Sequence, residues 1–377
     1  MPRSIYIHIP FCTQICYYCD FNKVFLKGQP VGEYLEALKT EMTTVFQMFP
    51  AQEIRTVFIG GGTPTALSPG QLEYLMQMIH QFVTVNPETE FTIEANPGDL
   101  SAEKLAVLKN YGVNRLSLGV QSFNDRLLKE IGRSHRTKDV YETVERARKT
   151  GFENISIDLM YGLPGQTLGD VKDSLQSFFD LQLEHCSAYS LIIEPKTVFY
   201  NLMNKGKLTL PPEELEAAMY ETIMEEMDKH GFRQYEISNY AKEGFESKHN
   251  LVYWDNEEYY GFGAGAHSYI NNARRSNIGP VNHYIKATKN GKLPVREENS
   301  LSKKEQIEEE MFLGLRKNQG VSLSRASQKF QINLREYYKK EIEELLKKRL
   351  ITVENDHIKL TKQGRLLGNI VFQQFLK

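Results

Sequence analysis

Three of the chain's four cysteines lie within eight residues, as Cys12, Cys16 and Cys19, and Cys186 stands alone far downstream. Thiolates this close together repel one another unless a cation neutralises them, so the spacing indicates a metal centre before it indicates packing. Three ligands are one fewer than structural zinc normally takes from a protein. On a four-iron cluster, three thiolates would leave one iron open to a small molecule.

Two other interpretations of these cysteines stay open at this point. His8 precedes the first cysteine and would complete a zinc site of the Cys3His type. Alternatively, two of the thiols could form a disulfide and leave the third unpaired. Cys186 falls in an apolar run, where we expect it to pack as a small apolar side chain.

Further residues able to bind a ligand follow the ends of predicted strands. The carboxyl ends of parallel strands are where α/β folds build their sites. Glycines allow close approach to the backbone, carboxylates accept hydrogen bonds from an ammonium or a hydroxyl, and an amide offers a donor and an acceptor together. An arginine further along the chain has the planar fork that suits a carboxylate. These residues are Gly61, Gly62, Thr63, Glu94, Gln121, Arg133 and Asp158.

The elements that must position these residues form a βα repeat. From Ser4 to about Cys186, short runs rich in Val, Ile and Phe alternate with longer segments of helical period, which predicts a parallel sheet. Ser68 before Pro69, and Ser101, predict helix starts, while Gly112 and Gly151 predict helix ends. Six repeats fall short of the eight of a closed barrel, so this pattern leaves an open sheet and a partial barrel undecided. The strand candidates are 4–9, 56–59, 90–94, 115–120, 154–159 and 186–192.

The second half of the chain has a different layout. Residues 233–269 are dense in Tyr, Asn, Gly and His, which suits loops and short strands. After Ser300, amphipathic helices precede a predicted β-hairpin over 350–360, which gives the end of the chain a winged-helix character. Without a basic surplus, we interpret it as a docking or lid module rather than a DNA reader. We therefore predict three regions: a barrel over 1–195, a connector with a further motif over 196–299, and a small helical domain over 300–377.

Composition excludes several classes of partner. The formal net charge is -2, so nothing indicates a nucleic-acid coat or a polybasic membrane anchor. No apolar run approaches the roughly 18 residues of a membrane span, and Met1 leads directly into a predicted strand without a signal peptide. Few and clustered cysteines fit a reducing compartment. We therefore expect a cytoplasmic protein.

The run Tyr6-Ile7-His8-Ile9-Pro10-Phe11-Cys12, continued through Cys16, Cys19 and Phe21, resembles the cysteine loop of radical S-adenosylmethionine (SAM) proteins. The resemblance is to the branch of oxygen-independent coproporphyrinogen oxidases and their haem-chaperone relatives. It implies a partial (β/α)6 barrel, a [4Fe-4S] cluster on the three cysteines, and SAM on the fourth iron. It also implies a set of SAM-binding positions, which are Tyr6, Tyr18, Gly61, Gly62, Thr63, Glu94, Gln121, Arg133 and Asp158.

Two features bear on which member of the branch this chain resembles. Oxidases of the branch carry a cysteine where this chain has Phe21, and they have a long N-terminal extension, whereas here Tyr6 is already the sixth residue. The segment His249-Asn250-Leu251-Val252-Tyr253-Trp254 matches the signature of the haem chaperones. The resemblance thus implies haem as a third cofactor, with His249 as the candidate for its iron ligand. Because an imidazole can ligate haem iron, His267 is a second candidate.

The function expected from the resemblance is to bind haem and pass it to acceptor proteins, with the cytoplasmic membrane face as one place for that transfer. The alternative is the oxidase reaction, which converts coproporphyrinogen III to protoporphyrinogen IX; the two departures argue against it. Whether SAM is cleaved productively and whether the chain forms a homodimer stay open.

Overall fold

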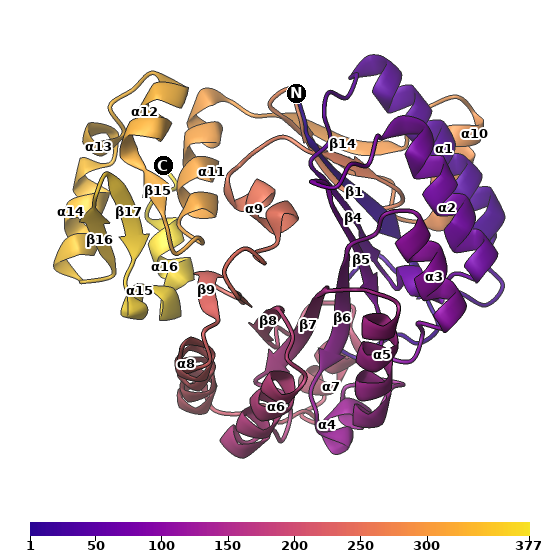
Figure 1. Cartoon of the computed structure of the whole chain (residues 1–377). Helices are drawn as coiled ribbons and strands as arrows, with labels where there is room; N and C mark the ends of the chain where they lie inside the picture. Colours follow the sequence, from indigo (N-terminus) through magenta and orange to yellow (C-terminus); the bar gives the residue numbers. More distant parts are fainter.

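The computed structural model describes all residues, 1–377, and its larger part is built on one nine-stranded sheet (Figure 1). The strand order is β11-β1-β4-β5-β6-β7-β8-β10-β9. The six central strands are all parallel and follow one another in chain order, as the βα repeat predicted. They are β1 (Ser4–Ile9), β4 (Thr56–Gly61), β5 (Glu90–Ala95), β6 (Arg115–Gln121), β7 (Asn154–Tyr161) and β8 (His185–Ser190).

Helices that connect these strands cover the outer face of the curved sheet (Figure 1). Their predicted starts and ends hold: the Ser68 hydroxyl accepts from the Gln71 N–H at 3.3 Å, and Gly112 and Gly151 adopt φ of 82° and 90° just after helix ends. Apolar faces of helices and strands merge into one core of 55 buried residues, in which Cys186 is fully buried. These elements are α1 (Val31–Met48), η1 (Pro64–Ala66), α2 (Pro69–Phe82), α3 (Ala102–Asn110), α4 (Asp125–Glu130), α5 (Thr137–Lys149), α6 (Leu168–Asp180), α7 (Val198–Asn204) and α8 (Glu213–Lys229).

Three further strands, from the region predicted as a connector, extend the sheet at both edges. β11 (Tyr260–Phe262) pairs in parallel with β1, while β10 (Asn239–Ala241) pairs antiparallel with β8 and with β9 (Arg233–Glu236). Each has only three or four residues, too short for alternation to distinguish from a loop. The sheet does not close on itself, so the barrel is partial.

The rest of this region folds beside the mouth of the sheet. A three-stranded antiparallel sheet contains β12 (His267–Ile270), β13 (Ala273–Asn277) and β14 (Val295–Ser300). The helix α9 (Lys248–Trp254) lies between the main sheet and the end of the chain, and α10 (Val281–Lys289) packs on α1 (Figure 1).

The end of the chain has its own core of 17 buried residues. The predicted hairpin is present, with Asn355 and Asp356 both at positive φ as a type I′ turn requires. A third strand completes a small sheet of order β15-β17-β16 that helices surround. The elements are α11 (Lys303–Gly314), β15 (Val321–Ser322), α12 (Leu323–Phe330), α13 (Leu334–Tyr337), α14 (Lys339–Lys347), β16 (Ile351–Glu354), β17 (His357–Leu360), α15 (Lys362–Leu366) and α16 (Gly368–Gln373).

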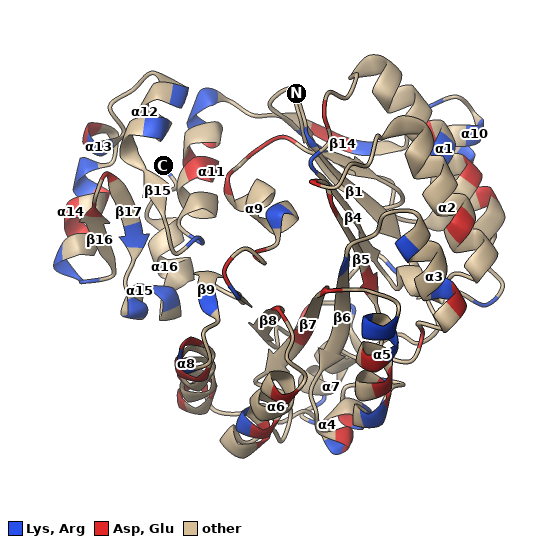
Figure 2. Ribbon diagram, in the orientation of Figure 1, with Lys and Arg blue, Asp and Glu red and all other residues tan.

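The predicted fold class is confirmed: a partial parallel barrel with a smaller winged-helix-like unit after it. Lys and Arg are interspersed with Asp and Glu along the outer helices and the C-terminal unit (Figure 2). None of the helices combines the length with the apolar composition that crossing a bilayer demands.

Candidate metal and cofactor site

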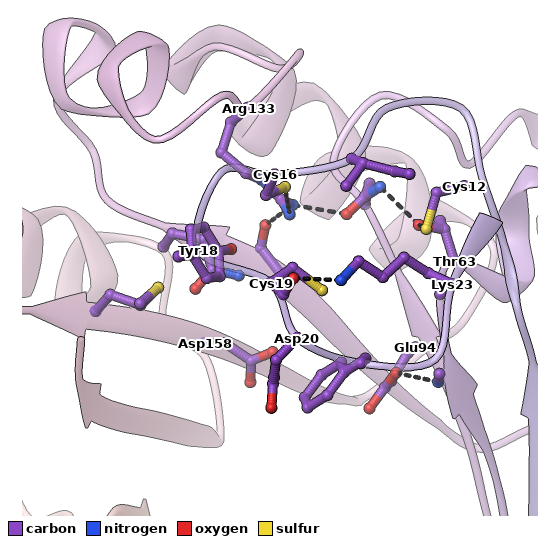
Figure 3. Close-up of a pocket in the computed structure, with 18 of the residues that line it drawn as sticks. Cys12, Cys16, Tyr18, Cys19, Asp20, Lys23, Thr63, Glu94, Arg133 and Asp158 are labelled. Carbon is purple, nitrogen blue, oxygen red and sulfur yellow. Dashed lines mark hydrogen bonds between the residues drawn. The ribbon is translucent and has the colours of Figure 1, made fainter. Parts of the chain in front are cut away.

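The three clustered cysteines lie on residues 12–23, which we call the cysteine loop. It leaves β2 (Phe11–Cys12) and returns in β3 (Val24–Phe25), and the two strands pair in parallel. A hydrogen bond from the Tyr17 N–H to the Ile131 carbonyl, 3.1 Å long, ties the tip of the loop to the end of α4. All three thiols face one cavity of about 340 Å³, the cysteine cavity, at the carboxyl ends of the strands (Figure 3).

The geometry fits a multi-iron cluster better than the two alternatives. All four cysteines are free thiols, so the loop contains no disulfide. His8 makes a poor zinc ligand because its Nδ1 bonds the Tyr6 hydroxyl at 2.9 Å and its Nε2 bonds the Asn22 carbonyl at 2.7 Å. No three His, Cys, Asp or Glu side chains are grouped closely enough here to hold a single metal ion. A cubane needs no such grouping because each thiolate binds a different iron.

Burial makes these thiols costly to ionise without a cation. Desolvation raises the pKa of Cys12 to about 11, partly offset by the Thr63 hydroxyl, 3.7 Å from its sulfur. Desolvation also raises the pKa of Cys19. A cationic centre bound in this cavity would reverse both shifts, because it stabilises the thiolate form.

The glycine run at the end of β4 forms a wall that tolerates no side chain. A Cβ on Gly62 would lie 2.9 Å from the Cys12 sulfur and 2.8 Å from the Pro10 carbonyl carbon. Gly61 adopts φ of +118°, and a Cβ there would lie 2.6 Å from the His8 ring. The glycines therefore allow this run to pack directly against β1 and the start of the cysteine loop. Gly61, Gly62 and Thr63 also line the cysteine cavity, and ligand binding by them stays a prediction.

A hydrogen-bonded chain joins two of the cysteines across the cavity. Arg133 donates to the Cys16 sulfur at 3.3 Å, to the Asn96 side-chain oxygen at 2.6 Å and to the Gly119 carbonyl. Asn96 in turn donates to the Thr63 hydroxyl at 3.1 Å, and that hydroxyl points at Cys12 (Figure 3). These hydrogen bonds thus fix the positions of Cys12 and Cys16 relative to the ends of β5 and β6.

Two carboxyl groups line the sheet side of the cysteine cavity. Burial, and the charge of Asp158, raise the pKa of Glu94 to about 8, although the Gly61 N–H donates to it at 3.0 Å. Burial raises the pKa of Asp158 to about 6, with Ser187 and Arg115 working in the opposite direction. Such perturbed carboxyl groups in a cavity are typical of ligand sites, where a bound cation would lower both pKa values.

Gln121 ends β6 in a strained conformation. Its φ is 68°, and the pairing of β6 with β7 shifts register just before it. The Tyr189 hydroxyl donates to the Gln121 side chain at 3.1 Å. The Gln121 side chain lines the cysteine cavity.

Sequence reasoning brought together most of this site but missed several of its residues. Asn96 lies two residues after Glu94, so its side chain points to the same face of the chain. Tyr189 is likewise two residues after Ser187 in β8, and this spacing could have identified it. The structure brings the predicted residues together around the cysteine cavity, except Tyr6 and His249. The predicted residues that line it are Cys12, Cys16, Tyr18, Cys19, Gly61, Gly62, Thr63, Glu94, Gln121, Arg133 and Asp158.

Tyr6 lies on the other side of the Gly61 and Glu94 wall. It faces a second cavity of about 430 Å³, which we call the tyrosine cavity. Its hydroxyl bonds His8, whose ring in turn lies against Gly61. Tyr6 does not line the cysteine cavity, although the two cavities share Phe21, Gly61 and Glu94. The contact of Tyr6 with SAM that the resemblance implies stays a prediction.

His249 is buried in α9 and has no free ring nitrogen. Its Nδ1 bonds the Thr56 hydroxyl at 2.7 Å, its Nε2 bonds the Tyr253 hydroxyl at 2.8 Å, and the ring stacks on Phe58. Burial, with a smaller contribution from Arg115, lowers its pKa to about 3. As folded here, His249 supports α9 on the sheet, and a role as iron ligand would require one of these hydrogen bonds to break and the buried ring to become accessible.

Trp254, from the same segment, faces away from both cavities. The Arg316 guanidinium lies 4.4 Å from its ring centroid, so the ring contacts the C-terminal unit. Of the aromatic residues in this segment, Tyr253 is the one that lines the tyrosine cavity.

Family models match both parts of the chain. Residues 6–178 match the radical SAM superfamily, and residues 301–367 match the HemN C-terminal domain. Among curated proteins, the chain is 56% identical to the haem chaperone HemW of Bacillus subtilis (strain 168), over 99% of each chain. It is 52% identical to the haem chaperone HemW of Lactococcus lactis, over 100% of this chain and 97% of that protein.

A solved structure extends the likeness to the whole fold. The coproporphyrinogen III oxidase HemN of Escherichia coli, described as a radical SAM enzyme, superimposes with a TM-score of 0.87. The match covers 100% of this chain and 90% of that chain at 25% sequence identity. The partial barrel and the C-terminal unit are thus arranged as in that structure.

Proposed function

This chain belongs to the radical SAM superfamily, on the branch that includes the haem chaperones, and we propose that it binds haem and passes it to acceptor proteins. One observation carries the proposal: 56% identity to a haem chaperone extends over 99% of both chains. Identity at this level covers the cysteine loop, the His249 to Trp254 segment and the C-terminal unit together, so no functional part is left out of the match.

We propose that the cysteine cavity holds a [4Fe-4S] cluster with SAM beside it. Cys12, Cys16 and Cys19 would supply the three thiolates, and their convergence on one cavity without a fourth protein ligand supports that set. When bound, a reduced cluster of this kind supplies one electron to the sulfonium of SAM. The chain's own part is to bind and orient SAM and to exclude water from the cavity.

The residues proposed to hold SAM differ in what they offer. The glycine wall presents backbone groups, Glu94 and Asp158 present oxygens that suit an ammonium or a ribose hydroxyl, and Arg133 presents donors that suit a carboxylate. Gln121 and Tyr18 complete the lining. Because Glu94 has a pKa near 8, a bound cation is what would keep it ionised at neutral pH.

For haem, we propose a site beside the His249 to Trp254 segment rather than within it. His249 has both ring nitrogens bonded, but Tyr253 reaches the wall of the tyrosine cavity. Tyrosine rings supply flat apolar area that suits a macrocycle. The segment would then act on haem through Tyr253, with His249 holding that side chain in place.

The alternative to haem transfer is an enzymatic function, the oxidase reaction that converts coproporphyrinogen III to protoporphyrinogen IX. The likeness to HemN supports a shared fold. Phe21, 62% exposed at the rim of both cavities, stands where we expect the oxidases to have a cysteine, and this departure favours haem transfer over decarboxylation. We further propose that the chain acts in the cytoplasm, with haem-accepting proteins at the membrane face among its partners, and that a homodimer is one assembly to test.

One anaerobic preparation tests the proposal. Purified protein is titrated with haem, then incubated with an acceptor apoprotein and, separately, with coproporphyrinogen III, SAM and a reductant. We expect a stable Soret band, its transfer to the acceptor, and no protoporphyrinogen. Decarboxylation without haem uptake would refute the chaperone proposal, and haem that cannot leave the protein would refute the transfer step.

A further inference from the structure

The tyrosine cavity has the lining of a macrocycle site. It lies between β1, the cysteine loop and the start of β12, and its volume of about 430 Å³ is in the range of cofactor pockets. Aromatic rings dominate its walls, which suits a flat apolar ligand. Six of its ten lining residues carry aromatic or imidazole rings, namely Tyr6, Phe21, Tyr253, Tyr259, His8 and His267, and the other four are Asn22, Gly61, Glu94 and Gly265.

Of the three imidazoles in this neighbourhood, His267 alone has its ring free. His8 and His249 each use both nitrogens in hydrogen bonds inside the fold. His267 is the exposed first residue of β12, and its ring makes no hydrogen bond in the structure. A neutral imidazole with a free lone pair is the side chain that haem iron takes most often.

The backbone that carries His267 is held rigidly. His267 pairs with Ser276 across the β12–β13 ladder, and its carbonyl lies so close to Gly261 that a Cβ on that glycine would be 1.7 Å away. The turn before it is fixed by Asn22, which donates to the Ala264 carbonyl at 2.7 Å. His267 can therefore rotate its side chain without moving the wall of the cavity.

We propose that haem binds in the tyrosine cavity with His267 as an axial ligand of its iron. Tyr253 faces the macrocycle, and His249 acts as a positioning residue through its hydrogen bond to the Tyr253 hydroxyl. This inference rests on the proposed haem-binding function and assigns its site. The proposal explains why the histidine of the haem signature is buried. His249 shapes the wall that haem contacts, and the iron ligand is His267, 18 residues downstream.

Ligand exchange at position 267 is the direct test. Full-length wild type, His267→Ala and His267→Cys are titrated anaerobically with haem, and His283→Ala serves as the control because His283 is an equally exposed histidine on α10. We expect His267→Ala to weaken haem binding about tenfold or more, the order of loss seen when a metal site is weakened. His267→Cys should bind haem with the Soret position and ligand-field bands of a thiolate complex, and the control should match wild type.

Each other result overturns a distinct claim. Wild-type affinity and spectrum in His267→Ala would remove His267 from the site, as would an unchanged imidazole spectrum in His267→Cys. A phenolate spectrum in wild type would assign the ligand to a tyrosine of the same cavity and also overturn the proposal. Failure of wild type to bind haem at all would instead refute the proposed function. Matching melting temperatures of wild type and the three variants establish that a loss of haem binding does not result from a loss of folding.

Discussion

Replacing His249 by alanine should change the stability of the fold in a way that depends on pH. The side chain is 1% exposed, and its two ring nitrogens pair with Thr56 and Tyr253. Removing it leaves the buried Thr56 hydroxyl and the half-buried Tyr253 hydroxyl without their partner, at about 1–3 kcal/mol for each unsatisfied buried group. We expect the free energy of unfolding to fall by about 3 kcal/mol near neutral pH.

The pH dependence follows from the lowered pKa of His249. Burial holds it at about 3 in the folded protein against 6.5 for an ordinary imidazole, so the unfolded chain takes up a proton first as pH falls. His249 therefore contributes stability that is fully present above pH 6.5 and is lost as pH falls towards 3. Between about pH 7.5 and about pH 5.5, wild type should lose about 1.4 kcal/mol that the alanine variant cannot lose.

Urea unfolding of both proteins at the two pH values measures this difference. Other histidines also titrate, but they are present in both chains, so they cancel in the comparison. Tyr253→Phe is the matched control: it removes one hydrogen bond, should cost about 1 kcal/mol, and keeps the imidazole. A stability difference between wild type and His249→Ala that stays constant over this pH range would refute the buried, neutral His249 described here.

Three further predictions concern the cysteine cavity. Cys12→Ser, Cys16→Ser and Cys19→Ser should each abolish the brown chromophore after anaerobic reconstitution with iron and sulfide; full iron content in any of them would contradict the ligand assignment. Gly62→Ala should lose most of its iron as well, because its Cβ would lie 2.9 Å from the Cys12 sulfur, whereas Gly70→Ala, with no atom within 4 Å of its Cβ, should retain iron; equal iron content would show that the wall yields. Arg133→Lys should keep the cluster but weaken SAM binding about tenfold in equilibrium dialysis, because lysine lacks the planar fork that contacts Asn96 and Gly119; an unchanged affinity would remove Arg133 from the SAM site.

The sequence predicted the central sheet because its signals were long and consistent. Each of the six strands has six to eight residues, long enough for a pattern of apolar side chains to show, and Ser68, Ser101, Gly112 and Gly151 mark helix boundaries by local chemistry. The edge strands β9, β10 and β11 escaped prediction because strands of three or four residues are defined by their partners rather than by their own pattern.

The sequence predicts which residues meet at the candidate site where their position in the fold determines this. It does not predict a residue's role where that role depends on its hydrogen-bond partners. Residues at the carboxyl ends of parallel strands must converge, so Glu94, Gln121 and Asp158 could be grouped from the order of the strands alone. Whether His249 has a free nitrogen depends on Thr56, which is 193 residues away in sequence. No local pattern carries that information. The signature therefore predicts His249 as an iron ligand, whereas in the structure both of its ring nitrogens are hydrogen-bonded.

The two cavities share a wall, and this links the cysteine loop to the proposed haem site. Phe21, Gly61 and Glu94 line both. Next to Phe21, the carbonyl of Asn22 bonds His8, and the side chain of Asn22 donates to the Ala264 and Gly279 carbonyls at 2.7 and 2.9 Å. Asn22 thus belongs to the cysteine loop and also holds the turn before His267. A change in the conformation of this loop would reach the proposed haem site through that residue, because the same side chain bonds both the Ala264 and the Gly279 carbonyls.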